Sequence, residues 1–143
     1  MTDDTLDQPS LHALLAAGRT VRIRPVRRDD HEQLQGLYEV MSPENLCLRF
    51  FAASRRSAAR AADRACAPRR PGCRALPAET ESQVIGLAEY DTGGTEPDAR
   101  TAEISLAVAD GLHHRGVGTL LIEHLVSVAR AWSARARRRS PSR

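Results

Sequence analysis

The sequence predicts a single domain of the α/β class (α+β), in which strands and amphipathic helices follow one another. Three observations predict it. Segments 21–24, 84–90 and 101–109 are short and apolar or alternating, as strands are. One stripe of apolar residues recurs at the spacing of a helix face over residues 34–41. A glycine-bearing turn then joins the last strand to a second apolar helix. With 143 residues, the chain has room for one domain.

The first half of the chain reads as a leader, a strand and two helices. We expect residues 1–19 to be a flexible polar leader with a helical turn near 11–16. A strand at 21–24 ends at Pro25. Asp29 and Asp30 offer caps to a helix over 30–41. Ser42-Pro43 then begins a short helix through residue 48.

The second half reads as a helix, strands and a final helix. We expect a helix over 57–66, a poor strand at 74–78 because Pro77 interrupts it, and a better strand at 84–90. A turn over 91–100 leads to the strand at 101–109. The last helix has one apolar face, made by Val117, Leu121, Leu125, Val128 and Trp132.

The charge of the chain lies unevenly. The net charge is +3, and every residue counted as Lys+Arg is an arginine. Arg130, Arg135, Arg137, Arg138, Arg139 and Arg143 follow residue 129 without an acidic partner, so residues 1–129 carry −3. We therefore expect residues 133–143 to be a basic, disordered tail. Nucleic acid is not the expected partner, since no aromatic platform or recognition motif accompanies these arginines.

The cysteines and the hydropathy indicate a cytoplasmic protein. Cys47, Cys66 and Cys73 are odd in number and form no Cys-x-x-Cys pair, which favours reduced thiols and no zinc site. No run approaches the roughly 18 apolar residues of a membrane helix. The acidic start of the chain differs from a signal peptide.

The most informative segment is 102–125, which reads as a strand, a glycine turn and the start of a helix. Arg115, Gly116 and Gly118 stand where the helix begins. Unpaired amides and the helix dipole at such a point suit a phosphate group. Glycine removes the Cβ that would keep a ligand from the backbone. The segment therefore predicts a site for a diphosphate.

Two familiar diphosphate motifs fit this segment poorly. Gly111 and Gly116 have the spacing of a P-loop, but Val117 stands where that motif needs lysine. A dinucleotide fingerprint needs a third glycine, where this chain has Leu121. It also expects an acidic residue about 20 positions later, where this chain has arginines and serines and no acidic residue.

The segment resembles the coenzyme A loop of the GNAT superfamily of N-acetyltransferases, whose pattern is (Gln/Arg)-x-x-Gly-x-(Gly/Ala). Residues 113–118, His-His-Arg-Gly-Val-Gly, match it with His113 in place of Gln or Arg. The resemblance reaches upstream to about Val21. It is nearest to bacterial protein-lysine acetyltransferase domains, which carry segments similar to 42–51 and 102–108.

The resemblance implies a mixed, mainly antiparallel sheet flanked by helices, with acetyl-CoA as co-substrate and no metal. The acceptor would be an amine, either a protein lysine or a small amine. The cofactor would contact the backbone of the last strand and the glycine turn: Leu106, Ala107, Val108, His113, His114, Arg115, Gly116, Val117, Gly118 and Thr119. Residues 20–132 would be a partial GNAT domain that lacks the family's C-terminal strand, helix and hairpin.

Transfer of an acyl group to an amine needs a base, and two carboxylates are candidates. Glu103 is the first, since the resembling family often has a glutamate at that point of the strand. Alternation places Glu103, Ser105 and Ala107 on one face. Glu89, on the preceding strand, is the rival.

Two other hypotheses remain open. The chain could be a truncated, inactive acetyltransferase that at most binds coenzyme A, because no β pattern follows the last helix. In that case the strand at 101–109 would be an exposed edge, open to association. A nucleic-acid-binding module that uses the C-terminal arginines is the third reading.

Overall fold

The computed structural model describes residues 10–15, 18–41, 55–67, 72–81, 83–92, 102–109 and 116–139. Its centre is a five-stranded sheet in the order β1-β2-β3-β4-β5, and every neighbouring pair is antiparallel. The elements, in chain order, are β1 Leu11–Leu14, β2 Thr20–Ile23, the 3-10 turn η1 Arg28–Asp30, α1 His31–Val40, α3 Arg55–Cys66, β3 Cys73–Thr80, β4 Gln83–Asp91, β5 Glu103–Val108 and α4 Val117–Arg139. The predicted α/β class and its mainly antiparallel sheet are confirmed.

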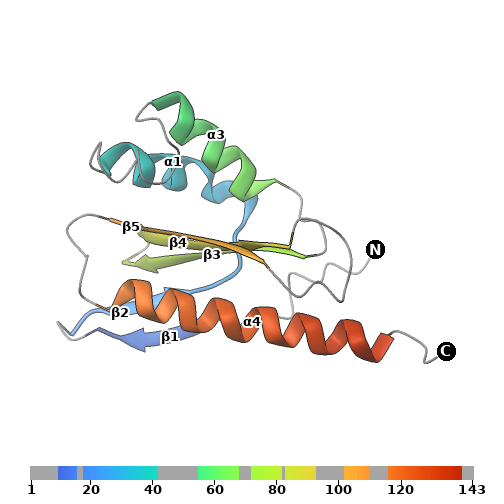
Figure 1. The fold of residues 1–143 in the computed structure, drawn as a ribbon. Coiled ribbons are helices and arrows are strands. Elements are labelled where there is room, and N and C mark those ends of the chain that lie inside the picture. The colour runs from blue at the N-terminus through green and yellow to red at the C-terminus, as the bar shows by residue number, and fades with distance from the viewer. Residues whose placement is uncertain are drawn as a thin grey trace.

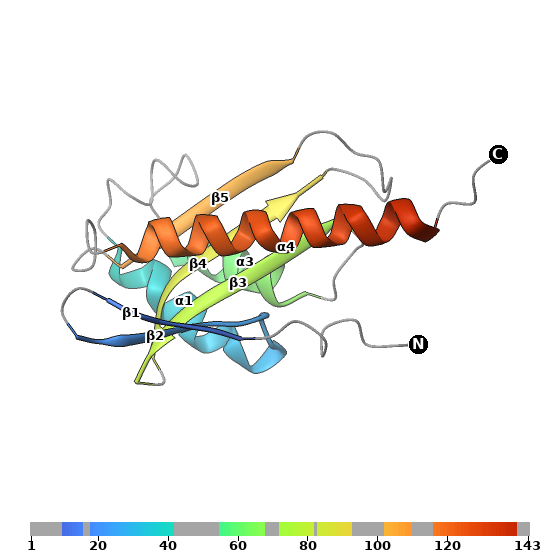
Figure 2. The ribbon, with the colours of Figure 1, turned by 90° about the horizontal axis from the view of Figure 1, so that it is seen from below.

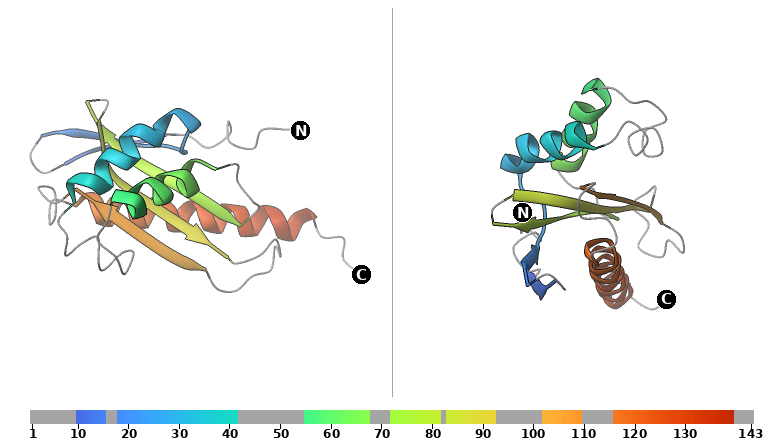
Figure 3. Two further views of the ribbon diagram at one scale, coloured as in Figure 1. Left: turned by 90° about the horizontal axis from the view of Figure 1, so that it is seen from above. Right: turned by 90° about the vertical axis from the view of Figure 1, so that its left-hand side faces the viewer.

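The sheet separates two layers of helices. Helices α1 and α3 cover one face, and α4 crosses the other, beside the β1–β2 hairpin (Figures 1 and 3). A cluster of buried side chains fills each interface. Leu34, Leu37 and Tyr38 of α1 belong to the first cluster. Leu121 and Leu125 of α4 belong to the second.

Helix α1 forms as the apolar stripe predicts, but the side chain of Asp30 does not cap its start as expected. Asp30 stands at the N-cap of α1 without a capping bond from its side chain. Its carboxylate instead accepts hydrogen bonds from Arg24 at 2.8 and 2.7 Å, and from the Arg27 amide at 2.6 Å. Arg24 also donates to Glu79 of β3. This buried cluster ties the start of α1 to the sheet.

The expected helical turn near residues 11–16 is wrong, and so is the expectation that all of 1–19 is a leader. Residues 11–14 form β1, which pairs in full with β2. Leu11 and Ala13 alternate with His12 and pack against the α4-side cluster. Pairing with a neighbouring strand therefore outweighs local helix propensity here.

Pro77 does not break its strand, contrary to the sequence expectation. It lies inside β3, opposite Leu87 of β4. Its carbonyl accepts from the Arg24 amide, on the side away from β4. In an antiparallel strand the N and O atoms of one residue point the same way, so the ladder to β4 loses no donor. The N–H that proline lacks would point to the other side, toward the chain that follows the end of β2.

Helix α4 is longer than expected. It runs to Arg139, so residues 133–139 of the expected disordered tail are helical. Alanine and arginine both have high helix propensity and simply propagate the helix begun at Val117. The final turns extend past the ends of the strands (Figure 2). The expected helix at 42–48 lies outside the described residues.

Candidate functional site

The glycine turn lies where β5 passes into α4. Gly116 has φ +88, a conformation that side chains with a Cβ rarely adopt. Among the described residues, no atom lies within 4 Å of the point where a Cβ would stand. The Gly116 backbone is therefore not covered by any described side chain. His113, His114 and Arg115 lie outside the described residues.

The start of α4 supplies donors at the same place. The first intrahelical bond of α4 runs from the Leu120 amide to the Gly116 carbonyl, at 3.1 Å. The amides of Val117, Gly118 and Thr119 precede that bond, and helix geometry gives them no intrahelical acceptor. The helix dipole adds positive potential. Val117 is buried and Thr119 is exposed. The buried side chain of Val117 anchors the start of the helix, and its backbone amide lies in the first turn.

Two glycines bring α4 close to the sheet. A Cβ on Gly118 would lie 3.4 Å from a methyl group of Leu106 and 3.8 Å from one of Val108. A Cβ on Gly86 would lie 3.0 Å from Leu121 Cδ1 and 3.1 Å from the Ala107 carbonyl oxygen. Sequence reasoning missed Gly86. A lone glycine inside a strand pattern is the signal of such a close approach.

Strand β5 is the last strand of the described sheet and pairs with β4. Ala107 is buried under α1 and α3, whereas Leu106 and Val108 pack toward α4. The predicted alternation of β5 is therefore confirmed. Ile104, on the α4 side, is 50% exposed. The residues expected to meet a cofactor through their backbone thus lie on a strand at the sheet's edge.

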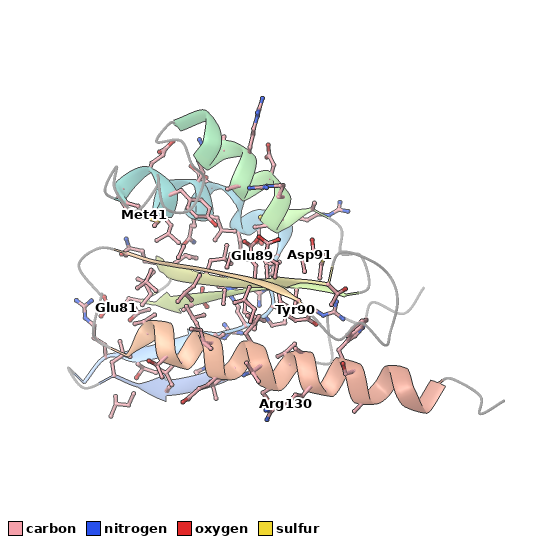
Figure 4. The ribbon with its side chains drawn as sticks, in the orientation of Figure 1. Met41, Glu81, Glu89, Tyr90, Asp91 and Arg130 are labelled. Carbon is pink, nitrogen blue, oxygen red and sulfur yellow. The ribbon has the colours of Figure 1, made fainter. Side chains whose placement is uncertain are left out.

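Both candidate carboxylates lie on the face that α1 and α3 cover. Glu103 begins β5 and is exposed, whereas Glu89 is half-buried on β4. In the register, Glu103 stands opposite Asp91 and Glu89 opposite Ser105. Glu89 and Asp91 extend from the sheet toward the α1–α3 layer (Figure 4). The structure therefore brings the two candidate bases onto one face, as diagonal neighbours of adjacent strands.

Tyr90 points to the opposite face, into the cluster beneath α4. Burial raises the pKa of its hydroxyl. That hydroxyl is buried and has no hydrogen-bond partner among the described residues. Tyr90 is thus separated by the sheet from the carboxylates and does not join them in one site.

The glycine turn and Glu103 mark the two ends of β5. At about 3.3 Å per residue, the five steps from Glu103 to Val108 span roughly 17 Å. A ligand held at the start of α4 reaches the carboxylates only by running along the strand. An extended, linear ligand fits this arrangement better than a compact one.

The described residues hold neither a cluster of metal ligands nor a membrane-spanning helix. No group of three or more His, Cys, Asp and Glu in that part of the chain is arranged to hold a metal ion. None of the helices described is both long and apolar enough to cross a bilayer.

Comparison with solved structures relates the fold to known proteins. The GNAT domain of S. lividans PAT matches with a TM-score of 0.80 and 31% identity over 89% of this chain and 77% of that one. A cAMP-binding acyltransferase from Mycobacterium smegmatis matches with a TM-score of 0.55 and 20% identity, over 87% of this chain and 36% of that one. An aminoglycoside 6'-N-acetyltransferase complexed with coenzyme A matches with a TM-score of 0.57 and 18% identity, over 77% of this chain and 56% of that one. The last two show the fold alone.

Comparison with protein families gives the same result. Residues 34–139 match the model of the acetyltransferase (GNAT) family, a span that holds most of α1 and all of α3, β3 to β5 and α4. No curated protein matches the chain. The family match covers most of the chain, and the S. lividans domain shares its fold at more than 30% identity. The chain therefore belongs to the GNAT acetyltransferase family.

Proposed function

We propose that the chain is an N-acyltransferase that moves an acetyl group from acetyl-CoA to an amine, a protein lysine or a small amine. The observation that carries the proposal is the left-handed Gly116 at the start of α4, the next described element after the edge strand β5. Family membership supplies the reaction class. The resemblance of segments 42–51 and 102–108 to bacterial protein-lysine acetyltransferase domains favours a protein lysine as acceptor.

The residues present fit a diphosphate and an extended arm. The amides from Gly116 to Thr119, with the positive end of the α4 dipole, would hold the diphosphate. His113, His114 and Arg115 would add donors to it. The backbone of Leu106 to Val108 would pair with the arm along the edge of β5. Acetyl-CoA supplies the acyl thioester.

Glu103 is the proposed base. An amine attacks a thioester only after losing its proton, so a carboxylate must lie where the amine arrives. Glu103 stands at the exposed start of β5 and is reached from solvent. Glu89 lies beside it on the same face and is the rival for the role. The protein otherwise contributes orientation of the two reactants.

Titration calorimetry with acetyl-CoA tests the cofactor site. The wild-type chain should bind, and Gly116→Ala should lower the affinity by about tenfold or more, because a Cβ enters the open space above the amides. Gly36→Ala is the matched control. Gly36 lies inside α1, and a Cβ there meets no atom of the described residues within 4 Å. Absence of binding by the folded wild-type chain would refute the proposal.

Steady-state kinetics separates the two carboxylates. With acetyl-CoA and poly-L-lysine, Glu103→Gln should lower kcat by about 10²-fold or more, the usual contribution of a general base. Glu89→Gln should retain most of kcat. The reverse pattern would assign the base to Glu89. Binding of acetyl-CoA without transfer to any amine would instead favour a chain that only binds the cofactor.

A further inference from the structure

A cross-strand hydrogen bond joins Ser105 to Glu89 on the face that α1 and α3 cover. Ser105 Oγ donates to Glu89 Oε2 across 3.2 Å. The two residues are direct partners in the β4–β5 register, and both are half-buried. The hydroxyl donates and the carboxylate accepts, so the bond holds the two side chains together across the strands.

This bond is one of the contacts that hold the Glu89 side chain in place. Glutamate has several rotatable bonds, and contact at its carboxylate end restricts them all. Serine is short, so the backbone of β5 determines where its hydroxyl lies. The bond therefore helps to place the Glu89 carboxylate, two residues along the strands from the Glu103–Asp91 pair.

We infer that Ser105 is a positioning residue, whose hydroxyl fixes the Glu89 carboxylate where a cationic amine acceptor approaches Glu103. The inference rests on the proposed function. Glu89 attracts the ammonium form of the acceptor through its charge, and Glu103 then takes the proton. Ser105 neither contacts the acceptor nor moves a proton. Its loss therefore weakens acceptor binding more than it slows the chemical step.

Three serine variants of the full chain test this with acetyl-CoA at saturation and poly-L-lysine as the acceptor probe. Ser105→Ala should raise the KM for poly-L-lysine by about three- to tenfold and leave kcat within about twofold, as expected for loss of one hydrogen bond to a charged group. Ser105→Thr keeps the hydroxyl and should restore KM. Ser127→Ala, at an exposed position on α4, should match the wild type.

A double variant shows whether Ser105 acts through Glu89. Once Glu89→Gln has removed the charge, adding Ser105→Ala should raise KM no further, because the two residues form one interacting pair. Circular dichroism of each variant shows that it is folded. An unchanged KM in Ser105→Ala, a fall in kcat at constant KM, or fully additive effects would overturn the inference.

The wild-type chain separates this inference from the function beneath it. If it binds acetyl-CoA but transfers nothing to poly-L-lysine, the acceptor role of Glu89 and Ser105 is wrong, while the cofactor site stands. If it binds no acetyl-CoA, the proposed function itself fails. Turnover with a normal KM in Ser105→Ala refutes the positioning role alone.

Discussion

At the scale of single residues, the charged cluster of Arg24, Asp30 and Glu79 matters most for the fold. The side chains of Arg24 and Asp30 are each 5% exposed, and that of Glu79 is 15% exposed. Burial tends to raise the pKa of Asp30, but hydrogen bonds from Arg24 and the Arg27 amide outweigh it and lower that pKa. The hydrogen bond to Asp30 raises the pKa of Arg24. Both groups are thus charged in the folded protein.

Asp30→Asn should destabilise the fold and change its response to acid. Breaking a buried ion pair costs about 3 kcal/mol or more. The folded-state pKa of Asp30 lies below the unfolded value, so its contribution is complete above about pH 4 and is lost as the pH falls through the folded pKa. Urea unfolding from pH 3 to 7 measures this. Wild type should lose stability below about pH 4 and approach the stability of the variant.

The exposed neighbour Asp29 gives the control for this prediction, Asp29→Asn. Equal stability of the two variants at pH 7 would contradict the role of the cluster.

Residue types alone could predict part of the candidate site. Gly116 and Gly118 are candidates because glycine at a helix start has a specific physical use. Glu103 and Glu89 were candidates because alternation along a strand fixes the face of each side chain. The bond from Ser105 to Glu89 could not be predicted, since it depends on the register between two strands and joins residues sixteen positions apart in the chain. The cluster around Arg24 depends in the same way on β3 lying beside β2.

At the scale of elements, long periodic segments could be predicted and short ones could not. The stripes of α1 and α4 each repeat over several turns, so the helical period is clear. Strand β1 has only four residues, and its pairing with β2 decides its conformation. Pro77 made β3 hard to predict, because a strand accepts proline only where its nitrogen faces no hydrogen-bonding neighbour. The pairing of the strands decides this, and the sequence of the segment alone does not.

Gly86→Ala should weaken the contact of α4 with the sheet. Strand β4 is irregular here, because Ala78 pairs with Gly86 while Glu79 pairs with Val84, which leaves Ile85 as an extra residue. A Cβ at Gly86 would press on Leu121 and on the backbone oxygen of Ala107. Because the backbone oxygen cannot move aside as a side chain can, we expect a loss of about 1–3 kcal/mol. Thermal unfolding measures it.

The matched control for that substitution is again Gly36→Ala. It adds the same methyl group inside a helix with open space around it, and should stabilise the fold by about 0.5–1 kcal/mol. The affinity for acetyl-CoA should fall in Gly86→Ala, because the start of α4 shifts with the helix. If Gly86→Ala were as stable as the wild type, α4 would not pack against Gly86 as closely as the structure indicates.

At the scale of the whole molecule, one sheet supports two cores. Alternate residues of β3 and β4 point to opposite layers: Leu87 belongs to the cluster under α1 and α3, and Leu76 and Ala88 belong to the cluster under α4. Separating either helical layer from the sheet would expose apolar side chains of β3 and β4. The two faces of the sheet are therefore coupled through residues one position apart in the chain.

This coupling predicts a single cooperative unfolding transition. Trp132, the only tryptophan, lies on α4 and reports on that layer through its fluorescence. Far-UV circular dichroism reports on all the helices and strands together. In urea, the two signals should give the same midpoint, as two-state unfolding requires. Coenzyme A should move both midpoints to higher urea together, because a ligand that binds only the folded state stabilises all of it.

If tryptophan fluorescence changes at lower urea than circular dichroism, α4 detaches as a separate unit. The start of α4 could then not be held rigidly enough against β5 to present its amides to a cofactor.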